Sequence, residues 1–470
     1  MRKIIAIVSV VMLIASTSIF AQDNEKTHTT DVVKVKQIGK NVIGYYTSWE
    51  WYKRQGLASP VNIDFSKYSI INYAYFKPDT LGNLDGMDAW ADSILLRGLF
   101  DYSSLEQPFY LANTSLIDAA HVQGVKVLLS IGGWNNSNNF SKIAADSVKR
   151  ANFAHNCVLM CSKYEFDGID LNWEFPGSAE INGSEKDKQN FTLLINSVRD
   201  SLDAYGQKIK YKFLISAMFS PYDVHHAFIE WDKIKDKIDL FNVMTYDING
   251  PWSTHVSHSS PLYAPAQGDT TSFDNSFRRL TKLYGIPSKK INMGVGFNGR
   301  ATLGKVGEKI DLYSTNHSGL NDTILFTEEN GSTAYYNLIL QKNKFDERWD
   351  EKAQVPYLIG KGDLNTFVSY ENEKSLQLKT QYIKDNEAGG IVIWEISGDA
   401  IEKKPGQGFI YKSPLITAID DNFPTSRKRK IAKRYIAPSK PISKKEKGWR
   451  KNAVKQNINK IYLIKKPTNN

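Results

Sequence analysis

Short runs of β-branched and aromatic residues alternate along the chain with longer segments in which apolar residues recur every three or four positions. The longer pattern places apolar side chains on one face of a helix, whereas a short continuous apolar run is typical of a strand that is covered on both sides. Segments 147–164 and 187–205 have the helical pattern. Eight runs have the strand pattern, namely 41–46, 69–76, 126–131, 168–173, 212–218, 240–245, 291–296 and 390–394.

This order of elements predicts an α/β fold in which strand–helix units surround a parallel sheet. Eight strands in a body of about 400 residues favour a (β/α)8 TIM barrel, with the domain extending over 40–424. The segment at about 301–367, between the seventh and eighth strands, is too long for a simple crossover and contains hairpin-like and aromatic pieces. We therefore expect a small α+β insertion between strands 7 and 8.

The first 21 residues differ from this body. They combine a basic start, an apolar run and small residues up to Ala21, which predicts a cleaved signal peptide and a secreted protein. That run is too short to span a bilayer, and no other run of 18 or more apolar residues follows it. We expect no transmembrane segment in the mature chain.

The formal net charge of +10 is spread unevenly along the chain. Segment 425–470 contains 16 Lys and Arg and one acid, Glu446, so it carries +15 and the remainder is mildly acidic. Basic residues among prolines and serines are typical of a disordered tail. Two interpretations stay open for this tail: a solvated appendage without a fixed role, or contact with an anionic surface such as a membrane, a wall polymer or extracellular nucleic acid.

The rest of the composition limits the chemistry. A hydrophobic content of 41% and an aromatic content of 12% exclude a disordered protein as the whole answer. The two cysteines, Cys157 and Cys161, lie four positions apart on a predicted helix, and we interpret them as small buried side chains. Because the eight histidines show no paired metal-ligand spacing, we expect no metal and no cofactor.

The fourth predicted strand contains a row of polar residues. Side chains alternate between the two faces of a strand, so Asp170, Asn172 and Glu174 share one face. The apolar residues Ile169, Leu171 and Trp173 share the other. The alternatives are a solvated strand face, or a buried carboxylate that binds a backbone amide. Because barrel strands are covered on both sides, a polar row that ends in a glutamate instead indicates an acid at the mouth of the barrel.

The motif Asp-x-x-Asp-x-Asn-x-Glu, formed by Asp167, Asp170, Asn172 and Glu174, resembles the signature of family 18 of the glycoside hydrolases, the chitinase family. Further motifs match that family in order and spacing over about 42–399. They are Gly-Tyr-Tyr-Thr-Ser-Trp at 44–49, Tyr-Ala-Tyr at 73–75, Ser-Ile-Gly-Gly-Trp at 130–134, Met-Thr-Tyr-Asp at 244–247, Gly-Arg at 299–300 and Trp394.

This resemblance implies hydrolysis of β-1,4 bonds between N-acetylglucosamine units, with the acetamido carbonyl of the substrate as the nucleophile. Glu174 would be the general acid and then the base, and Tyr246 would hydrogen-bond the acetamido carbonyl. Asp170 and Asn172 would complete the catalytic group, and Asp167 would be structural. The implied substrate-binding residues are Tyr45, Trp49, Tyr75, Gly133, Trp134, Met244, Asp247, Arg300 and Trp394. The implied ligands are chitin or its oligosaccharides, and we expect a monomer because such a barrel buries its own core.

Two positions depart from the family pattern. Asn172 replaces a third aspartate, and Asn298 replaces a tyrosine two positions after Gly296, which replaces a proline. An amide at 172 accepts an N–H but carries no charge, so positive charge in the transition state loses a stabilising neighbour, at a cost of roughly 10²–10³ in rate. It also removes a like charge that would raise the pKa of Glu174.

Three functions remain open on these grounds. The first is a chitinase-like hydrolase with attenuated or acid-shifted activity, and the retained Glu174, Asp170, Tyr246 and Trp394 favour it. The second is a chitin-binding lectin without turnover. The third is an endo-β-N-acetylglucosaminidase that acts on glycoprotein glycans.

Overall fold

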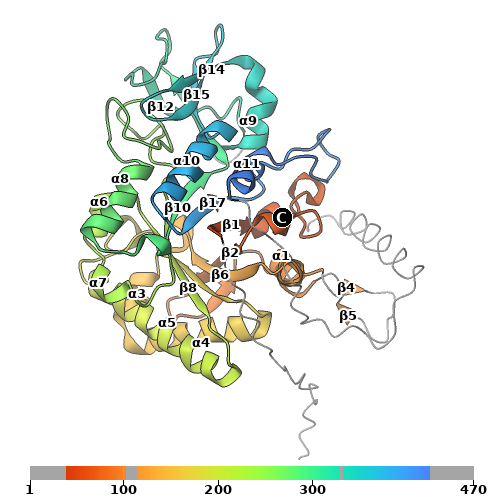
Figure 1. Cartoon of the computed structure of the whole chain (residues 1–470), viewed down its shortest axis with the longest axis vertical. Coiled ribbons are helices and arrows are strands. Elements are labelled where there is room, and N and C mark those ends of the chain that lie inside the picture. The colour runs from red at the N-terminus through yellow and green to blue at the C-terminus, as the bar shows by residue number, and fades with distance from the viewer. Residues whose placement is uncertain (1–38, 99, 102–108, 111–113, 328–331, 424–470) are drawn as a thin grey trace, which may run out of the picture. The chain divides into compact units, whose positions relative to one another are not determined.

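The computed structural model describes residues 39–98, 100–101, 109–110, 114–327 and 332–423 (Figure 1). The predicted signal peptide and the basic tail lie outside the described residues. Within the described ranges, no helix is both long enough and apolar enough to cross a membrane.

Eight parallel strands close into a barrel. Going round it, the strands are β1 (Asn41–Thr47), β2 (Ile70–Pro78), β6 (Lys126–Gly132), β7 (Gly168–Asn172), β8 (Leu214–Phe219), β9 (Leu240–Val243), β10 (Ile291–Gly296) and β17 (Gly390–Trp394). The barrel closes because β1 pairs with both β17 and β2. All eight predicted strands are present, with ends shifted by at most two residues, and the (β/α)8 fold class is confirmed.

Helices follow most of the strands and lie around the barrel (Figure 1). They are α1 (Ala89–Arg97), α2 (Leu116–Val122), α3 (Phe140–Ala145), α4 (Ser147–Tyr164), α5 (Asp187–Ile209), α6 (Asp223–His226), α7 (Trp231–Ile234), α8 (Phe273–Arg278), α10 (Glu373–Asp385) and α11 (Pro414–Asn422). The expected helix 147–164 is found with the same ends. It begins where the Asp146 carboxylate accepts hydrogen bonds from the Val148 and Lys149 N–H groups, as a helix N-cap does.

Helix α5 runs four residues beyond the predicted end at 205 and stops at Lys210, which has a left-handed conformation. Gly206 does not end the helix. A Cβ atom there would collide with the carbonyl oxygen of Tyr211, so this glycine allows the close approach of the following loop.

The described residues of the insertion between the seventh and eighth strands form a six-stranded antiparallel sheet and one α-helix. Its elements are β11 (Asn298–Gly304), β12 (His317–Asn321), β13 (Ser332–Ala334), α9 (Tyr335–Gln341), β14 (Phe345–Asp350), β15 (Val355–Gly360) and β16 (Thr366–Ser369). It starts three residues before the predicted 301 because β11 follows β10 almost directly. Three short strands, β3 (Leu84–Gly86), β4 (Phe100–Asp101) and β5 (Phe109–Tyr110), lie between β2 and β6 in the sequence.

The core has two parts that follow from the alternation along the strands. Ile169, Leu171 and Trp173 belong to a large apolar cluster that includes residues of the surrounding helices. A smaller cluster, with Tyr45 and Tyr246 among its members, includes inward-facing strand residues. The polar row of β7 therefore shares the interior of the barrel with aromatic side chains.

Candidate active site

Asp170 lies inside the barrel and is fully buried. Its Oδ2 accepts hydrogen bonds from Tyr45 Oη at 2.6 Å and from Ser130 Oγ at 2.7 Å, and its Oδ1 accepts one from Ser216 Oγ. Burial raises the pKa of Asp170, and the hydroxyl donors partly offset that increase. The three donors come from β1, β6 and β8, so this carboxyl group ties distant strands together below the mouth of the barrel.

Asn172 is the second member of the row and is 1% exposed. Its Nδ2 donates a hydrogen bond to Tyr75 Oη at 2.8 Å. Its Oδ1 has no hydrogen-bond partner among the residues that the structure describes. A buried acceptor without a donor is costly, so this carbonyl oxygen is suited to accept a hydrogen bond from a water molecule or from an N–H group of a ligand.

Glu174 directly follows Trp173 at the C-terminal end of β7, where its backbone N–H donates to Ser137 Oγ at 2.9 Å. Burial raises the pKa of its half-buried carboxyl group to about 8; a hydrogen bond from Asn172 lowers that pKa, and the charges of Asp247 and Asp170 raise it. The family pattern predicts that a like charge at position 172 raises the pKa of the glutamate at 174. In the structure burial is the largest cause, so Glu174 keeps its proton at neutral pH although position 172 is an amide.

Four aromatic rings, from β1, β2 and β17 or directly after β1, pack together beside this row. Trp394 stacks on Tyr75 with ring centroids 5.9 Å apart, and Trp49 lies 6.0 Å from the same ring. Trp49 and Trp394 are half-buried, so both keep accessible ring surface for a ligand. Tyr45 is fully buried and its hydroxyl is bound to Asp170, so we interpret it as a residue that positions this carboxylate.

The Met-Thr-Tyr-Asp segment continues from β9 on the neighbouring side of the mouth. Met244 and Tyr246 are buried, and the ring of Tyr246 lies close to Gly294, where a Cβ atom would approach it to 2.8 Å. The Asp247 carboxylate accepts two hydrogen bonds from Arg300, at 2.7 Å from Nε and 2.5 Å from a terminal nitrogen. This two-bond ion pair fixes the carboxylate beside Glu174.

Two further predicted residues lie on the rim. Trp134 is 58% exposed, and Gly133 has a φ of 86°. A Cβ atom at Gly133 would lie 2.8 Å from the ring of Tyr75, so the glycine lets this ring occupy its place. Trp252 is also 58% exposed and lies 5.3 Å from the Arg300 guanidinium.

The two departures at 296 and 298 are structurally linked. The side chain of Asn298 donates a hydrogen bond to Ser332 Oγ at 2.8 Å, within the insertion. Its Oδ1 occupies the space that a Cβ atom at Gly296 would take. A side chain at 296 and the present conformation of Asn298 exclude each other, so the two substitutions fit together.

Asp167 lies outside the mouth, immediately before β7. It accepts hydrogen bonds from Val127 N–H and from His121 Nε2, both at 2.7 Å, and from the Tyr211 hydroxyl. Burial raises the pKa of Asp167, but these hydrogen bonds outweigh it and leave the pKa below its usual value. The position and partners of Asp167 are those of a residue that braces the strand.

The structure adds Glu395, a residue that none of the sequence motifs contains. It follows Trp394 and accepts hydrogen bonds from Thr47 Oγ1 at 3.1 Å, Ser397 N–H at 3.0 Å and Ser397 Oγ at 2.7 Å. Burial, followed by the nearby charge of Glu50, raises the pKa of Glu395 well above its usual value. A glutamate directly after the last barrel strand was a signal that could have indicated a second acid at the mouth.

The raised pKa values of Glu174 and Glu395 predict that stability falls with rising pH. A carboxyl group whose folded pKa is raised contributes stability that is complete below its unfolded pKa of about 4.3 and is lost as the pH rises through the folded pKa. Replacing Glu395 by Gln removes one such group. We expect the free energy of unfolding of Glu395→Gln, minus that of the wild type, to be about 2 kcal/mol larger at pH 9 than at pH 5.

Denaturant unfolding at the two pH values measures this difference, with exposed Glu308→Gln as the matched control. The control should show the same pH dependence as the wild type. If Glu395→Gln also follows the wild type, Glu395 titrates like an exposed glutamate and this account of it is wrong.

The described residues contain no group of three or more His, Cys, Asp and Glu side chains that could hold a metal ion. Cys157 and Cys161 are buried and their thiols are free.

Comparison with known proteins gives consistent matches. The sequence profile described as "Glycosyl hydrolases family 18" matches residues 41–399. "Chitinase A1" from Niallia circulans is 32% identical over 403 residues, which cover 76% of this chain and 56% of that protein. "Chitinase B" from Serratia marcescens is 28% identical over 329 residues, which cover 60% of this chain and 65% of that protein. The match thus spans less than two thirds of either relative.

Among solved structures, "Chitinase ChiA74 from Bacillus thuringiensis" superposes with a TM-score of 0.69 at 26% identity. The superposition covers 82% of this chain and 70% of that one. Both sequence and fold therefore relate residues 41–399 to the same group of proteins.

Proposed function

The chain belongs to family 18 of the glycosyl hydrolases, and from this membership we propose that it hydrolyses β-1,4 bonds between N-acetylglucosamine units, as in chitin, by substrate-assisted retaining catalysis. One observation carries the proposal. Glu174, whose pKa is raised to about 8, stands at the mouth of the barrel beside accessible tryptophan rings and an amide oxygen that has no partner among the described residues.

Glu174 starts the reaction by donating its proton to the oxygen that links two sugars. The C–O bond to the anomeric carbon breaks, and the acetamido carbonyl of the same sugar attacks that carbon. Because nucleophile and electrophile belong to one ring, the attack needs no further ordering of two molecules. The deprotonated Glu174 then takes a proton from water, which opens the oxazolinium intermediate and restores the enzyme.

Residues around Glu174 orient the acetamido group. The Asn172 Oδ1 accepts the acetamido N–H, which supplies the donor that this buried oxygen lacks among the described residues. The Tyr246 hydroxyl donates to the acetamido carbonyl. Trp394 forms the apolar floor beneath the sugar ring, whose C–H face packs against the indole. Asp247, held by Arg300, binds the sugar or braces the site.

The ends of the chain complete the proposal. We propose that residues 1–21 direct export and that the tail 425–470 contacts an anionic surface, since it carries 16 basic residues and one acid. The proposed substrate of the barrel is neutral, whereas the proposed partner of the tail is anionic, so the two parts bind different ligands.

The pH dependence of cleavage tests the role of Glu174. The acid must be protonated to act, and its pKa is raised to about 8, so cleavage should remain near its maximum up to about pH 8. Above that, the rate should fall about tenfold per pH unit. Initial rates on N-acetylglucosamine hexamers between pH 5 and 10 measure this limb, with far-UV circular dichroism at each pH as a control for unfolding.

A limb near pH 5, where an exposed glutamate titrates, would show that burial does not set the protonation of Glu174. A high-mannose glycopeptide in the same assay separates the two substrate classes. Cleavage of the glycopeptide without cleavage of the hexamer would favour an endo-β-N-acetylglucosaminidase over the function proposed.

A further inference from the structure

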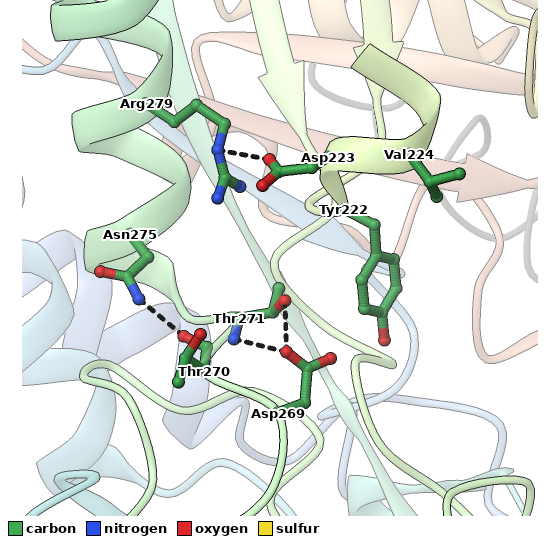
Figure 2. A pocket seen from close by; sticks show the side chains of 8 residues that line it. All are labelled: Tyr222, Asp223, Val224, Asp269, Thr270, Thr271, Asn275 and Arg279. Atoms are coloured by element: carbon green, nitrogen blue, oxygen red, sulfur yellow. Dashed lines mark hydrogen bonds and ion pairs between the residues drawn. The ribbon is translucent and has the colours of Figure 1, made fainter. Parts of the chain in front are cut away.

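A pocket of about 280 Å³ lies beside the mouth of the barrel (Figure 2). One wall comes from Tyr222 and Asp223, which follow β8, and the other from Asp269, Thr271 and Arg279, in and after the loop that follows β9. Both walls follow the C-terminal ends of barrel strands, as Glu174 does. The pocket therefore opens on the same face of the barrel as the candidate active site.

Two contacts connect the pocket walls to the active site. The Tyr222 hydroxyl donates a hydrogen bond to the carbonyl oxygen of Ile248, which directly follows Asp247. In the same segment, His225 stacks on Phe175, the residue after Glu174, with ring centroids 4.3 Å apart. The pocket and the proposed catalytic residues are thus held by adjoining pieces of chain.

The pocket lies across the mouth from the aromatic floor. Going round the barrel, β8 is four strands away from β1 in either direction, whereas Trp49, Tyr75 and Trp394 come from β1, β2 and β17 or directly after them. In the proposed mechanism Glu174 protonates the oxygen of the leaving group, so the leaving group lies on the Glu174 side of a sugar above Trp394. Glu174 follows β7, which pairs with β8, so sugars of the leaving group lie toward β8.

The side chains around the pocket combine donors, acceptors and a ring. The Asp269 Oδ1 accepts two hydrogen bonds from Thr271, at 2.8 Å from its N–H and 2.7 Å from its Oγ1, and its Oδ2 accepts none from the described residues (Figure 2). Arg279 pairs with Asp223 through Nε, which leaves its terminal nitrogens as donors toward the pocket (Figure 2). The Tyr222 hydroxyl is already bound, so its ring is the surface that remains.

This combination selects a ligand class. Two carboxylates and one guanidinium give the pocket a net charge of −1, which disfavours phosphate, sulfate or a carboxylate. Adjacent donors and acceptors beside an aromatic ring match the hydroxyls and the C–H face of a neutral sugar. The volume is near the lower end of the ~300–1,000 Å³ of small-molecule pockets, so it suits a single sugar unit.

We propose that this pocket is a subsite for one neutral sugar of the leaving-group end of the substrate chain. The proposal rests on the proposed function, and it assigns Asp269, Arg279 and Tyr222 to substrate recognition. Long oligosaccharides reach the pocket and short ones do not. The subsite therefore sets the preference for chain length.

The test compares hexamers with trimers of N-acetylglucosamine. Asp269→Asn turns the open acceptor into a donor while its other oxygen can still accept from Thr271, so the fold of the loop is retained. We expect the ratio of kcat/KM for hexamer over trimer to fall about tenfold. Tyr222→Leu should lower the same ratio by removing the ring. Exposed Asp311→Asn, in the insertion, is the matched control and should leave the ratio unchanged.

Calorimetric binding in a Glu174→Gln background separates the two proposals. In one outcome the wild type cleaves both oligomers, and Asp269→Asn changes neither the hexamer-to-trimer ratio of kcat/KM nor the hexamer affinity measured in the Glu174→Gln background. The subsite is then disproved and the proposed function stands. If nothing is cleaved while Asp269→Asn weakens hexamer binding about tenfold, the proposed function fails and the subsite stands.

Discussion

Replacing Glu174 by Gln should lower the rate of cleavage of N-acetylglucosamine oligomers by about 10³-fold. Glutamine keeps the shape of the side chain and can hydrogen-bond a ligand, but it has no proton to give to the leaving oxygen. The effect should lie in kcat, because the aromatic floor and the Asp247–Arg300 pair still bind the chain. Hexamer affinity measured by calorimetry should stay within a few-fold of the wild type.

Glu185→Gln is the matched control, because Glu185 is exposed in the loop after the same strand. It makes the same chemical change outside the site and should retain wild-type turnover. Equal rates for Glu174→Gln and the wild type would show that this chain is not a hydrolase that uses Glu174. If both proteins still bound the hexamer, the chitin-binding lectin would become the better description of this chain.

Replacing Asn172 by Asp should raise the cleavage rate by roughly 10²–10³-fold. A carboxylate at this position can still pair with the Tyr75 hydroxyl and accept the acetamido N–H, and it adds a negative charge next to the positive charge that forms in the transition state. The same charge lies close to Glu174 and Asp170 in a buried space. It should therefore raise the pKa of Glu174 further, and the alkaline limb of the rate profile should move above pH 8.

The cleavage rates of Asn172→Asp and of the wild type, measured between pH 5 and 10, give both the maximal rate and the position of the alkaline limb. Asn182→Asp adds a charge at an exposed position of the same loop and should change neither. If Asn172→Asp gains no rate and its alkaline limb stays in place, the amide at 172 is not what limits turnover.

The barrel could be predicted from the sequence because its signal is local. Each barrel strand is covered on both sides and so appears as a short apolar run, and each helix shows its buried face at a spacing of three or four residues. The same periodicity predicted that Asp170 and Asn172 share a face opposite Leu171, and the structure places Leu171 in the outer core.

Other features depend on contacts between distant segments. The strand pairing of the insertion follows from which short strands meet, as in the pairing of β11 with β16 across more than 60 residues. Gly296 and Asn298 appeared as two independent departures, whereas the structure shows that they share one space. The pocket beside β8 combines Tyr222 with Asp269, and no local pattern joins them.

The sequence by itself determined the class of fold, the polar row and the family resemblance, because these depend on residue types at fixed spacing along the chain. Only the tertiary structure decided the protonation of Glu174 and the partners of Asn172. A pKa depends on how far neighbouring atoms exclude water, and those neighbours come from strands that are far apart in the sequence. The spacing of the motif could place an acid at the mouth of the barrel, but burial there is what keeps its proton in place at neutral pH.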